Sequence, residues 1–216
     1  LDELGPEELG RRFGVAERSL RDSGVFYRVY DDAGGRERPW PLAPVPLVIS
    51  AAEWRQLSVG LVQRATLIEK ILADCYGDGS LVASGALPAA VIAGNREFLR
   101  PMVGAQPAGG RFLRLYSVDL GRGPDGRWWA LGDRTQAPSG AGYALENRVA
   151  LSRALPEVFR SLDVERLASF FQSLRDTLTG LVRRDEVRVG VLTPGLHNET
   201  YFEHAYLARY LGFLLV

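Results

Sequence analysis

Residues 187–216 read VRVGVLTPGLHNETYFEHAYLARYLGFLLV, and this stretch decides the fold class. Residues 187–192 favour a β-strand, which a Pro-Gly turn ends. Residues 199–211 predict a helix, and residues 213–216 predict a second strand. A strand, a turn, a helix and another strand begin a parallel α/β unit, so we expect a layer of this kind at the end of the chain.

The first half of the chain carries helix signals. Pro6 in the first turn, acidic residues after it and Gly24 beyond its end predict a helix over residues 6–22. Ser50 and Glu53 form a capping box that predicts a long helix, ended by a Gly-rich turn and burying one apolar stripe. We further expect strands at residues 25–30 and 47–49, a loop at 31–46, and a short helix between residues 88 and 99.

An antiparallel hairpin is predicted next. Residues 111–120 and 127–131 favour strands, and Asp125-Gly126 between them is a strong signal for a tight turn. We expect an ordered loop over residues 133–148, because small residues interrupt it three times. Residues 155–181 are expected to be helical, with a break near residues 162–163. The elements together predict an α+β fold.

Two acidic residues of the hairpin are candidate metal ligands. With the turn centred on Asp125-Gly126, Asp119 faces Gly132, and Asp133 lies one step further along. Opposed side chains lie roughly 5 Å apart, so Asp119 and Asp133 could share Mg²⁺. The alternative, which spacing alone favours, is that one ends a strand, the other opens a turn, and both are solvated.

The turn at residues 193–198 is a second candidate site. It lies at the carboxyl end of a strand and opens a helix, a place where α/β layers collect ligands. His197, Asn198, Glu199 and Glu203 are therefore candidate substrate-binding residues, with the two carboxylates four residues apart on one helix face. The alternative reading is that Asn198 caps the helix and Glu199 interacts with its dipole.

Composition excludes several classes of protein. The chain has 216 residues with 26 basic and 26 acidic side chains, so no basic surplus points to nucleic acid. No apolar run of about 18 residues predicts a membrane span, and no signal peptide is visible. The single cysteine, Cys75, fits a reducing compartment and a buried structural thiol, so we expect a cytoplasmic protein. Lys70 is the only lysine, which leaves few candidates for a phosphate clamp.

Two long strings carry a family resemblance. DRTQAPSGAGYALENR at residues 133–148, followed by LSRALP at 151–156, resembles the circularly permuted ATP-grasp type 2 family, as does VGVLTPGLHNETYFEHAYLARYLGF at 189–213. The hairpin resembles the metal-binding hairpin of ATP-grasp ligases, although Gly132 and Arg134 stand where the family has Glu and Asn. The hairpin also precedes the α/β unit, the reverse of the order in ordinary ATP-grasp ligases.

The resemblance implies an activity and a set of site residues. It implies an ATP-dependent carboxylate–amine ligase that forms an acyl phosphate, with ATP and Mg²⁺ as cofactors and small-molecule or peptide substrates. The implied residues are Asp119, Asp133 and Gln136 for the metal, Ser139 and Gly140 for the cofactor, Arg148 and Arg153 for catalysis, and His197, Asn198, Glu199 and Glu203 for the substrate. For Arg148 and Arg153, ordinary salt bridges are the favoured alternative. A degenerate, non-catalytic ATP-grasp module is the alternative for the whole protein.

The resemblance also implies a domain organisation. Residues 1–150 would form the permuted ATP-grasp part with the closing hairpin, residues 151–184 a helical connection, and residues 185–216 the start of a Rossmann-like layer that precedes the ATP-grasp fold. The nucleotide-binding strands are then expected beyond Val216, and the 216-residue piece alone is expected to be inactive.

Overall fold

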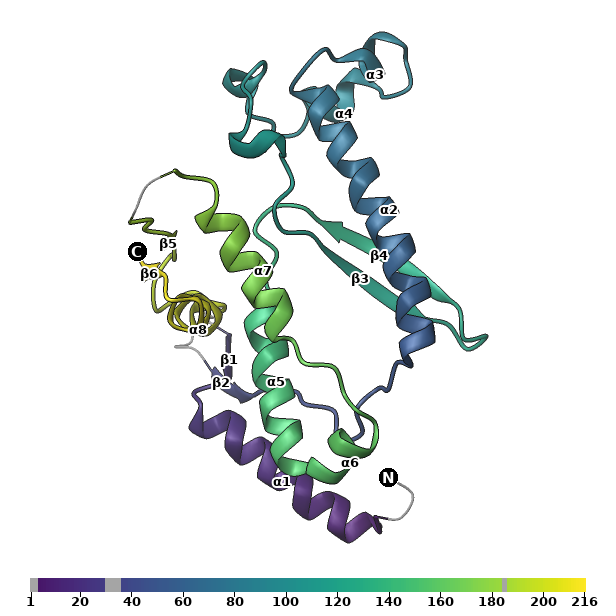
Figure 1. The fold of residues 1–216 in the computed structure, drawn as a ribbon, viewed down its shortest axis with the longest axis vertical. Helices are drawn as coiled ribbons and strands as arrows, with labels where there is room; N and C mark the ends of the chain where they lie inside the picture. The colour runs from purple at the N-terminus through teal and green to yellow at the C-terminus, as the bar shows by residue number, and fades with distance from the viewer. Residues whose placement is uncertain (1–3, 30–35, 184–185) are drawn as a thin grey trace. The chain divides into compact units, whose positions relative to one another are not determined.

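A computed structural model describes residues 4–29, 36–183 and 186–216, and the chain divides into two compact units (Figure 1). We call Leu1–Leu47 together with Ser139–Val216 the terminal unit, and Val48–Pro138 the central unit. The predicted domain boundary at residue 150 falls inside a helix of the terminal unit. The predicted domain boundary at residues 184–185 lies outside the described residues.

The terminal unit combines helices with short strands. Its elements are α1 (Pro6–Asp22), β1 (Phe26–Val29), β2 (Arg36–Pro39), α5 (Ala141–Ala154), α6 (Pro156–Ser161), α7 (Ala168–Thr179), β5 (Gly190–Val191), α8 (Tyr201–Leu211) and β6 (Leu214–Leu215). The prediction of α1 is confirmed. β2 corrects the loop expected at residues 31–46, because its backbone groups pair antiparallel with β1. Tyr30 and residues 31–35 of those predicted segments lie outside the described residues.

Helix α5 corrects the ordered loop expected over residues 133–148. The helix starts directly after Gly140, whose φ of +116° lies in a region that disfavours other residues. From there the chain carries good helix formers, including Ala144, Leu145 and Glu146. The small residues that suggested a loop therefore mark only the entry to the helix.

Helix α5 contributes to both hydrophobic clusters found among the described residues. Its Tyr143, Ala150 and Ala154 pack with Ala16 and Leu20 of α1 in the first cluster. Its Leu145 packs with Phe171 of α7 and Leu211 of α8 in the second. The core of the terminal unit therefore joins both ends of the sequence through one helix.

The parallel α/β unit predicted at the end of the chain is present. β5 and β6 pair in parallel, with Gly190 opposite Leu214 and Val191 opposite Leu215. The predicted helix begins at Tyr201 rather than Glu199. The delay arises because Asn198 Oδ1 accepts hydrogen bonds from Thr200 N at 2.9 Å and Thr200 Oγ1 at 2.6 Å, which continues the turn to Thr200.

The central unit is built on one long helix. It contains α2 (Ala51–Cys75), α3 (Ser80–Ala83), α4 (Ala89–Ala93), β3 (Ser117–Arg122) and β4 (Trp128–Arg134), with short 3₁₀ turns at Arg100–Met102 and Ala108–Gly110. The predicted capping box is confirmed at its first contact, because Ser50 Oγ accepts from Glu53 N at 3.2 Å. The strand expected at residues 47–49 is not formed, and the helix expected between residues 88 and 99 ends at Ala93.

Helix α2 combines a partly buried apolar stripe with polar contacts. The helix has no fully buried residue and Trp54 is 45% exposed, but Leu57, Leu61, Ala65, Ile68 and Leu72 are half-buried, so the predicted buried stripe is confirmed only in part. Glu53 accepts from Trp128 Nε1 at 2.8 Å. Glu69 accepts from the backbone N–H groups of Phe112 and Leu113 at 2.9 and 2.7 Å. Carboxylates on one helix thus anchor the hairpin and the segment before it.

The hairpin of β3 and β4 has the predicted register at its open end but a different turn. Gly126 has a φ of +78°, and its N–H donates to Gly123 O at 2.9 Å, so the loop is one residue longer than a two-residue turn. A bulge after Asp119 leaves Leu131 unpaired and restores the register. Asp119 therefore faces Gly132 as predicted, because the two irregularities cancel.

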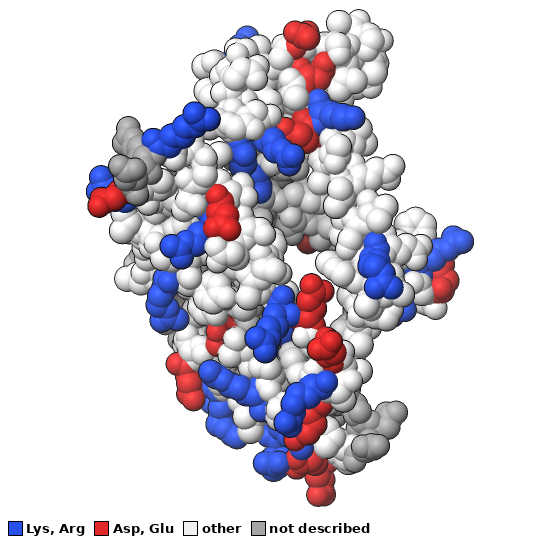
Figure 2. Space-filling model, viewed as in Figure 1, with Lys and Arg blue, Asp and Glu red and all other residues white. Residues whose placement is uncertain are grey.

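The mixture of helices and small sheets fits the predicted α+β class. None of the helices formed by the described residues is both long and apolar enough to cross a membrane. On the face drawn in Figure 2, acidic and basic side chains are interleaved rather than sorted by sign.

Candidate functional site

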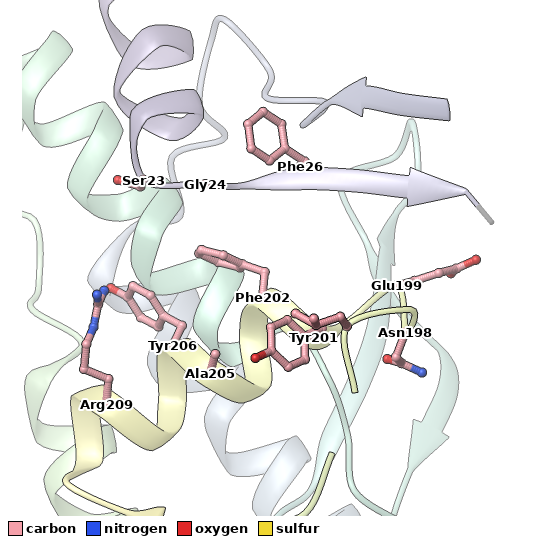
Figure 3. Close-up of a pocket in the computed structure, with 11 residues that line it drawn as sticks. Ser23, Gly24, Phe26, Asn198, Glu199, Tyr201, Phe202, Ala205, Tyr206 and Arg209 are labelled. Atoms are coloured by element: carbon pink, nitrogen blue, oxygen red, sulfur yellow. The ribbon is translucent and has the colours of Figure 1, made fainter. Parts of the chain in front are cut away.

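A cavity of about 430 Å³ lies in the terminal unit along α8, and we call it the α8 pocket (Figure 3). Its volume is within the range of about 300–1,000 Å³ typical of ligand sites. It is lined by Ser23, Gly24, Phe26, Leu196, Asn198, Glu199, Tyr201, Phe202, Ala205, Tyr206 and Arg209.

One face of α8 forms a wall of the pocket. Tyr201, Ala205 and Arg209 are four residues apart, as are Phe202 and Tyr206, so helical periodicity brings all five to adjacent positions. The residues after α1 and at the start of β1, Ser23, Gly24 and Phe26, supply further lining, and Figure 3 shows the Phe26 ring on the side of β1 away from Phe202. The pocket therefore forms where the two ends of the sequence meet.

The turn between β5 and α8 is fixed by side-chain hydrogen bonds. His204 places Nδ1 2.9 Å from Thr193 Oγ1 and Nε2 3.1 Å from Thr200 Oγ1. Thr193 is in turn tied to the sheet, because its N–H donates to Val216 O at 2.8 Å. These contacts hold Asn198 and Glu199 at the edge of the pocket.

A buried acid lies behind one end of the pocket. Glu146 of α5 is only 5% exposed, and its Oε1 accepts from Ser23 Oγ at 2.6 Å. Burial, followed by the charge of Glu146 and a hydrogen bond to it, raises the pKa of Tyr206 well above its ordinary range. Tyr206 therefore stays a neutral phenol at physiological pH and can act as a hydrogen-bond donor.

Aromatic rings continue from the pocket into the core. Trp40 stacks on Tyr143 with ring centroids 4.3 Å apart and planes 3° apart. Tyr143 contacts Phe202 at 5.4 Å, and Phe202 contacts Tyr206 at 5.5 Å. Offset ring pairs of this kind add about 0.5–1.5 kcal/mol each beyond area burial. The apolar part of the pocket is therefore continuous with the rigid core.

Glu203, a predicted substrate-binding residue, faces α5 instead of the pocket. It is 2% exposed, and its carboxylate accepts from Gly140 N at 2.7 and 2.8 Å and from Gly142 N at 2.8 Å. A carboxylate at the start of a helix satisfies N–H groups that have no partner within the helix. Because α8 begins at Tyr201, Glu199 lies outside the helix, and the two carboxylates do not share a helix face as expected.

Only two of the other three predicted substrate-binding residues line the α8 pocket. Asn198 and Glu199 line the α8 pocket, whereas His197 is exposed in the same turn and is not among its lining residues. Of the predicted cofactor residues, Ser139 is exposed and Gly140 is bound to Glu203.

The two predicted catalytic arginines make structural contacts within the terminal unit. Arg148 donates to Glu165 O at 3.1 Å and lies 5.8 Å from the centre of the Phe159 ring. Arg153 donates to Ser19 Oγ at 3.0 Å, which links α5 to α1. Neither lines the α8 pocket.

The predicted metal ligands are held by separate partners in the central unit. Asp119 pairs with Arg134 at 2.9 Å, and Asp133 pairs with Arg64 at 2.6 Å. Gln136 Nε2 lies 3.4 Å from a Glu97 carboxylate oxygen. Within the described ranges, no group of three or more His, Cys, Asp or Glu residues is arranged to hold a metal ion.

Cys75 at the end of α2 is half-buried, and burial raises the pKa of its thiol. A raised pKa keeps the thiol protonated and unreactive at neutral pH. Cys75 is thus less buried than predicted, and its structural role stays a prediction.

Asp133 also determines the ionisation of a tyrosine. Its carboxylate accepts from Tyr116 Oη at 2.5 Å, and burial together with this contact raises the Tyr116 pKa from 10.0 to about 12. A raised folded-state pKa stabilises the fold below pH 10.0, and the contribution is lost as the pH rises through about 12.

We therefore expect the free energy of unfolding of the native protein to fall between pH 10.0 and about pH 12. In the Tyr116→Phe variant it should fall less over the same pH range. Unfolding experiments at a series of pH values would measure both slopes. The absorbance of tyrosinate gives a second test, in which Asp133→Asn should move the Tyr116 titration to lower pH. A native protein and a Tyr116→Phe variant with the same pH slope would contradict the assignment.

Several pocket residues were not predicted as site residues. Phe26, Tyr206 and Arg209 carry no motif, and the contact of Ser23 with Glu146 behind the pocket forms only in three dimensions. The four-residue spacing of Tyr201, Ala205 and Arg209 in the predicted helix was the one available signal.

The sequence of the chain is similar to a known protein family and to several of its relatives. A model of the circularly permuted ATP-grasp type 2 family matches residues 46–216. The chain is 36% identical over 218 residues to uncharacterized protein sll0335 of Synechocystis sp.. This alignment covers 100% of this chain and 45% of the relative. It is 39% identical over 225 residues to uncharacterized protein Rv2567 of Mycobacterium tuberculosis, covering 99% of this chain and 25% of the relative.

A second protein of M. tuberculosis, uncharacterized protein Rv2411c, is 36% identical over 219 residues, covering 99% of this chain and 39% of the relative. The chain thus spans between a quarter and just under half of the length of these relatives. The match confirms the resemblance carried by residues 133–156 and 189–213. The chain belongs to the circularly permuted ATP-grasp type 2 family.

Proposed function

We propose that the whole protein is an ATP-dependent carboxylate–amine ligase. The observation that carries the proposal is the α8 pocket, which is lined in part by the turn that connects β5 to α8, in a member of an ATP-grasp family. Ligands of parallel α/β layers bind at this position, beside helix N-termini. A ligase of this family needs such a site for the molecule that is activated.

The proposed reaction has two steps. A substrate carboxylate oxygen takes the terminal phosphoryl group of ATP, which forms an acyl phosphate and releases ADP. An amine then attacks the acyl carbon, loses a proton, and expels phosphate to leave an amide. Phosphoryl transfer depends mainly on positioning and electrostatics, so the contribution proposed for this chain is to hold the substrate.

Residues of the terminal unit have distinct proposed roles. Asn198 and Glu199 orient the substrate at the edge of the α8 pocket, on a turn fixed by His204. Glu203 is a positioning residue, because it holds the start of α5 and with it the Ser139-Gly140 segment. Catalytic roles for Arg148 and Arg153, a substrate role for His197, and cofactor binding at Ser139 and Gly140 stay predictions. The proposed compartment is the cytoplasm, which fits the single cysteine.

Mg²⁺ is proposed to accompany ATP, as the resemblance implies, and it would neutralise charge on the phosphates. The described residues of the hairpin do not fit a Mg²⁺ site by themselves, because an arginine holds each of the two aspartates. No step is therefore assigned to a metal bound by Asp119, Asp133 or Gln136.

The pairing of Asp119 with Arg134 favours a second candidate function. Arg134 occupies a position where ATP-grasp ligases carry Asn, and its guanidinium lies against the aspartate that would bind the metal. A family member with this substitution could serve as a non-catalytic binding or assembly module. The two functions differ in what they predict for ATP.

Thermal unfolding of the complete protein with and without Mg·ATP tests the proposal. A ligase is expected to gain about 2.7 kcal/mol when free nucleotide is at 100 times its Kd. Mg²⁺ alone and Mg·AMP serve as controls. If Mg·ATP gives no more stabilisation than Mg·AMP, the ligase proposal fails and the binding or assembly module remains.

A further inference from the structure

The central unit has no fully buried hydrophobic core of its own. None of residues 48–138, all of which the structure describes, is fully buried, whereas the terminal unit has two clusters of buried residues. The unit consists of the long helix α2, short helical segments and the hairpin of β3 and β4. A hairpin alone is marginally stable, and a helix is stabilised mainly by packing of its apolar face. Another surface is therefore needed to complete a core here.

A groove in the central unit leaves apolar side chains open to such a surface. It has a volume of about 1130 Å³ and is lined by one face of α2 and by the hairpin, and we call it the α2 groove. Leu57 and Leu61 of α2 are half-buried along it, whereas Leu67 and, from the hairpin, Trp129 are each 58% exposed. Large apolar side chains that line a groove and stay exposed mark an interaction site.

Gly60 lines the α2 groove from the interior of the helix. Glycine destabilises a helix interior relative to alanine. Nothing among the described residues requires a glycine here, because a Cβ atom added to Gly60 would meet no atom within 4 Å. A glycine does allow another backbone to approach closely. The position therefore indicates an occupant that comes close to α2.

The open charges of the groove are positive. Among the described residues no carboxylate lies within 4.0 Å of the Lys70 ammonium, and Arg127 has one at 3.7 Å, from Asp125. Glu53 is the one acid among the described residues that line the groove, and Arg122 already holds it at 3.2 Å. Charge complementarity therefore favours an occupant with acidic groups beside its apolar surface.

The relatives of this chain contain additional polypeptide that could supply the occupant. The family model matches residues 46–216 and so includes the whole α2 groove. The alignments cover between a quarter and just under half of the three relatives, so the same region belongs there to a chain more than twice as long. A segment of the same polypeptide is held at a high effective concentration, which favours it over a separate partner.

We propose that the α2 groove is covered by a segment of the complete protein outside residues 1–216. This segment places an apolar surface against Gly60 and Trp129 and acidic groups beside Lys70 and Arg127. The proposal concerns the assembly of the protein and does not depend on ligase activity. A second copy of the chain and the terminal unit are the rival occupants, which the experiment separates.

Hydroxyl-radical footprinting of the complete protein and of the 216-residue chain tests the proposal, because side-chain oxidation follows exposure to solvent. Trp129 should be oxidised about fivefold more slowly in the complete protein, the change from 58% exposure to that of a core side chain. Trp54, which is exposed on α2 but does not line the groove, is the comparator and should keep its rate. Tyr143, buried in the terminal unit, should stay slow in both proteins and reports that each is folded.

Two matched variants test the groove itself. Gly60→Arg fills it, whereas Val59→Arg places the same side chain on the next residue, which is 74% exposed and outside the lining. Both should leave the circular dichroism of the 216-residue chain unchanged, because arginine favours a helix. In the complete protein, Gly60→Arg should return Trp129 to its rate in the 216-residue chain, and Val59→Arg should not. Lys70→Glu should weaken the protection of Trp129, and Lys70→Arg should keep it.

Each remaining outcome overturns the proposal. Fast oxidation of Trp129 in both proteins would mean that nothing covers the groove. Slow oxidation in the 216-residue chain would assign the groove to a second copy if dilution abolishes it, and to the terminal unit if dilution does not. Equal protection of Trp129 and Trp54, or equal effects of Gly60→Arg and Val59→Arg, would place the protected surface outside the groove.

Discussion

Replacing Glu203 by alanine is expected to destabilise the terminal unit by about 3–4 kcal/mol, because buried N–H groups that lose their acceptor cost about 1–3 kcal/mol each. The carboxylate is 2% exposed and accepts from the N–H groups of both Gly140 and Gly142. Water cannot replace it without entering the contact between α5 and α8. Glu203→Gln keeps one acceptor oxygen and is expected to cost less, about 1–2 kcal/mol.

Hydrogen exchange of the α5 amides would measure the loss, because a chain with two units need not unfold in one step. Glu165→Gln is a suitable control, since Glu165 is exposed and its contact with Arg148 uses only the backbone carbonyl. The control is expected to stay within about 0.5 kcal/mol of the native protein. A Glu203→Ala variant as stable as this control would contradict the role assigned to the carboxylate.

Tyr143→Ala is expected to cost about 3–5 kcal/mol, the range for removing a large aromatic side chain from a core. Tyr143 is 6% exposed, stacks on Trp40 at 4.3 Å and contacts Phe202 at 5.4 Å. Its removal leaves a cavity between α1, α5 and α8, and the wall of the α8 pocket loses its support. Urea unfolding would report the change if it is followed by the fluorescence of Trp40 in chains whose other three tryptophans, Trp54, Trp128 and Trp129, are replaced by phenylalanine.

Tyr143→Phe is the matched control for the ring. It deletes only the hydroxyl, which donates to Glu199 O over a long 3.3 Å. We expect a loss of about 0.5–1.5 kcal/mol, as for one ordinary hydrogen bond. If the Ala and Phe variants were equally unstable, the stacked ring would not be the main contribution.

Local signals in the sequence predicted local structure well. The bounds of α1 follow from Pro6, its acidic first turn and Gly24, all within one segment. The pairing of Asp119 with Gly132 was also predicted, although the assumed turn was one residue too short. The predicted pairing is correct only because a bulge at Leu131 offsets the longer turn, and no local feature of the sequence predicted this bulge.

Contacts between distant residues explain what was missed. Helix α5 was predicted as a loop because small residues interrupt its sequence, and the acceptor for the Gly142 N–H, Glu203, lies 61 residues away, outside that segment. The partner of Asp133 is Arg64, 69 residues earlier, so the sequence around the hairpin could not show that the carboxylate is already occupied. The α8 pocket needs α1, β1 and α8 together, and only its Asn198 and Glu199 were predicted.

The division of the chain also sets an order of events during synthesis. Ser19 contacts Arg153 and Ser23 contacts Glu146 across 134 and 123 residues, with the whole central unit between them. A ribosome that adds about 5–20 residues per second would leave α1 without α5 for on the order of ten seconds. The apolar face of α1 is exposed to aggregation or chaperone binding throughout that delay. Deleting the central unit and joining its ends with a short linker should therefore shorten the delay and speed folding of the terminal unit.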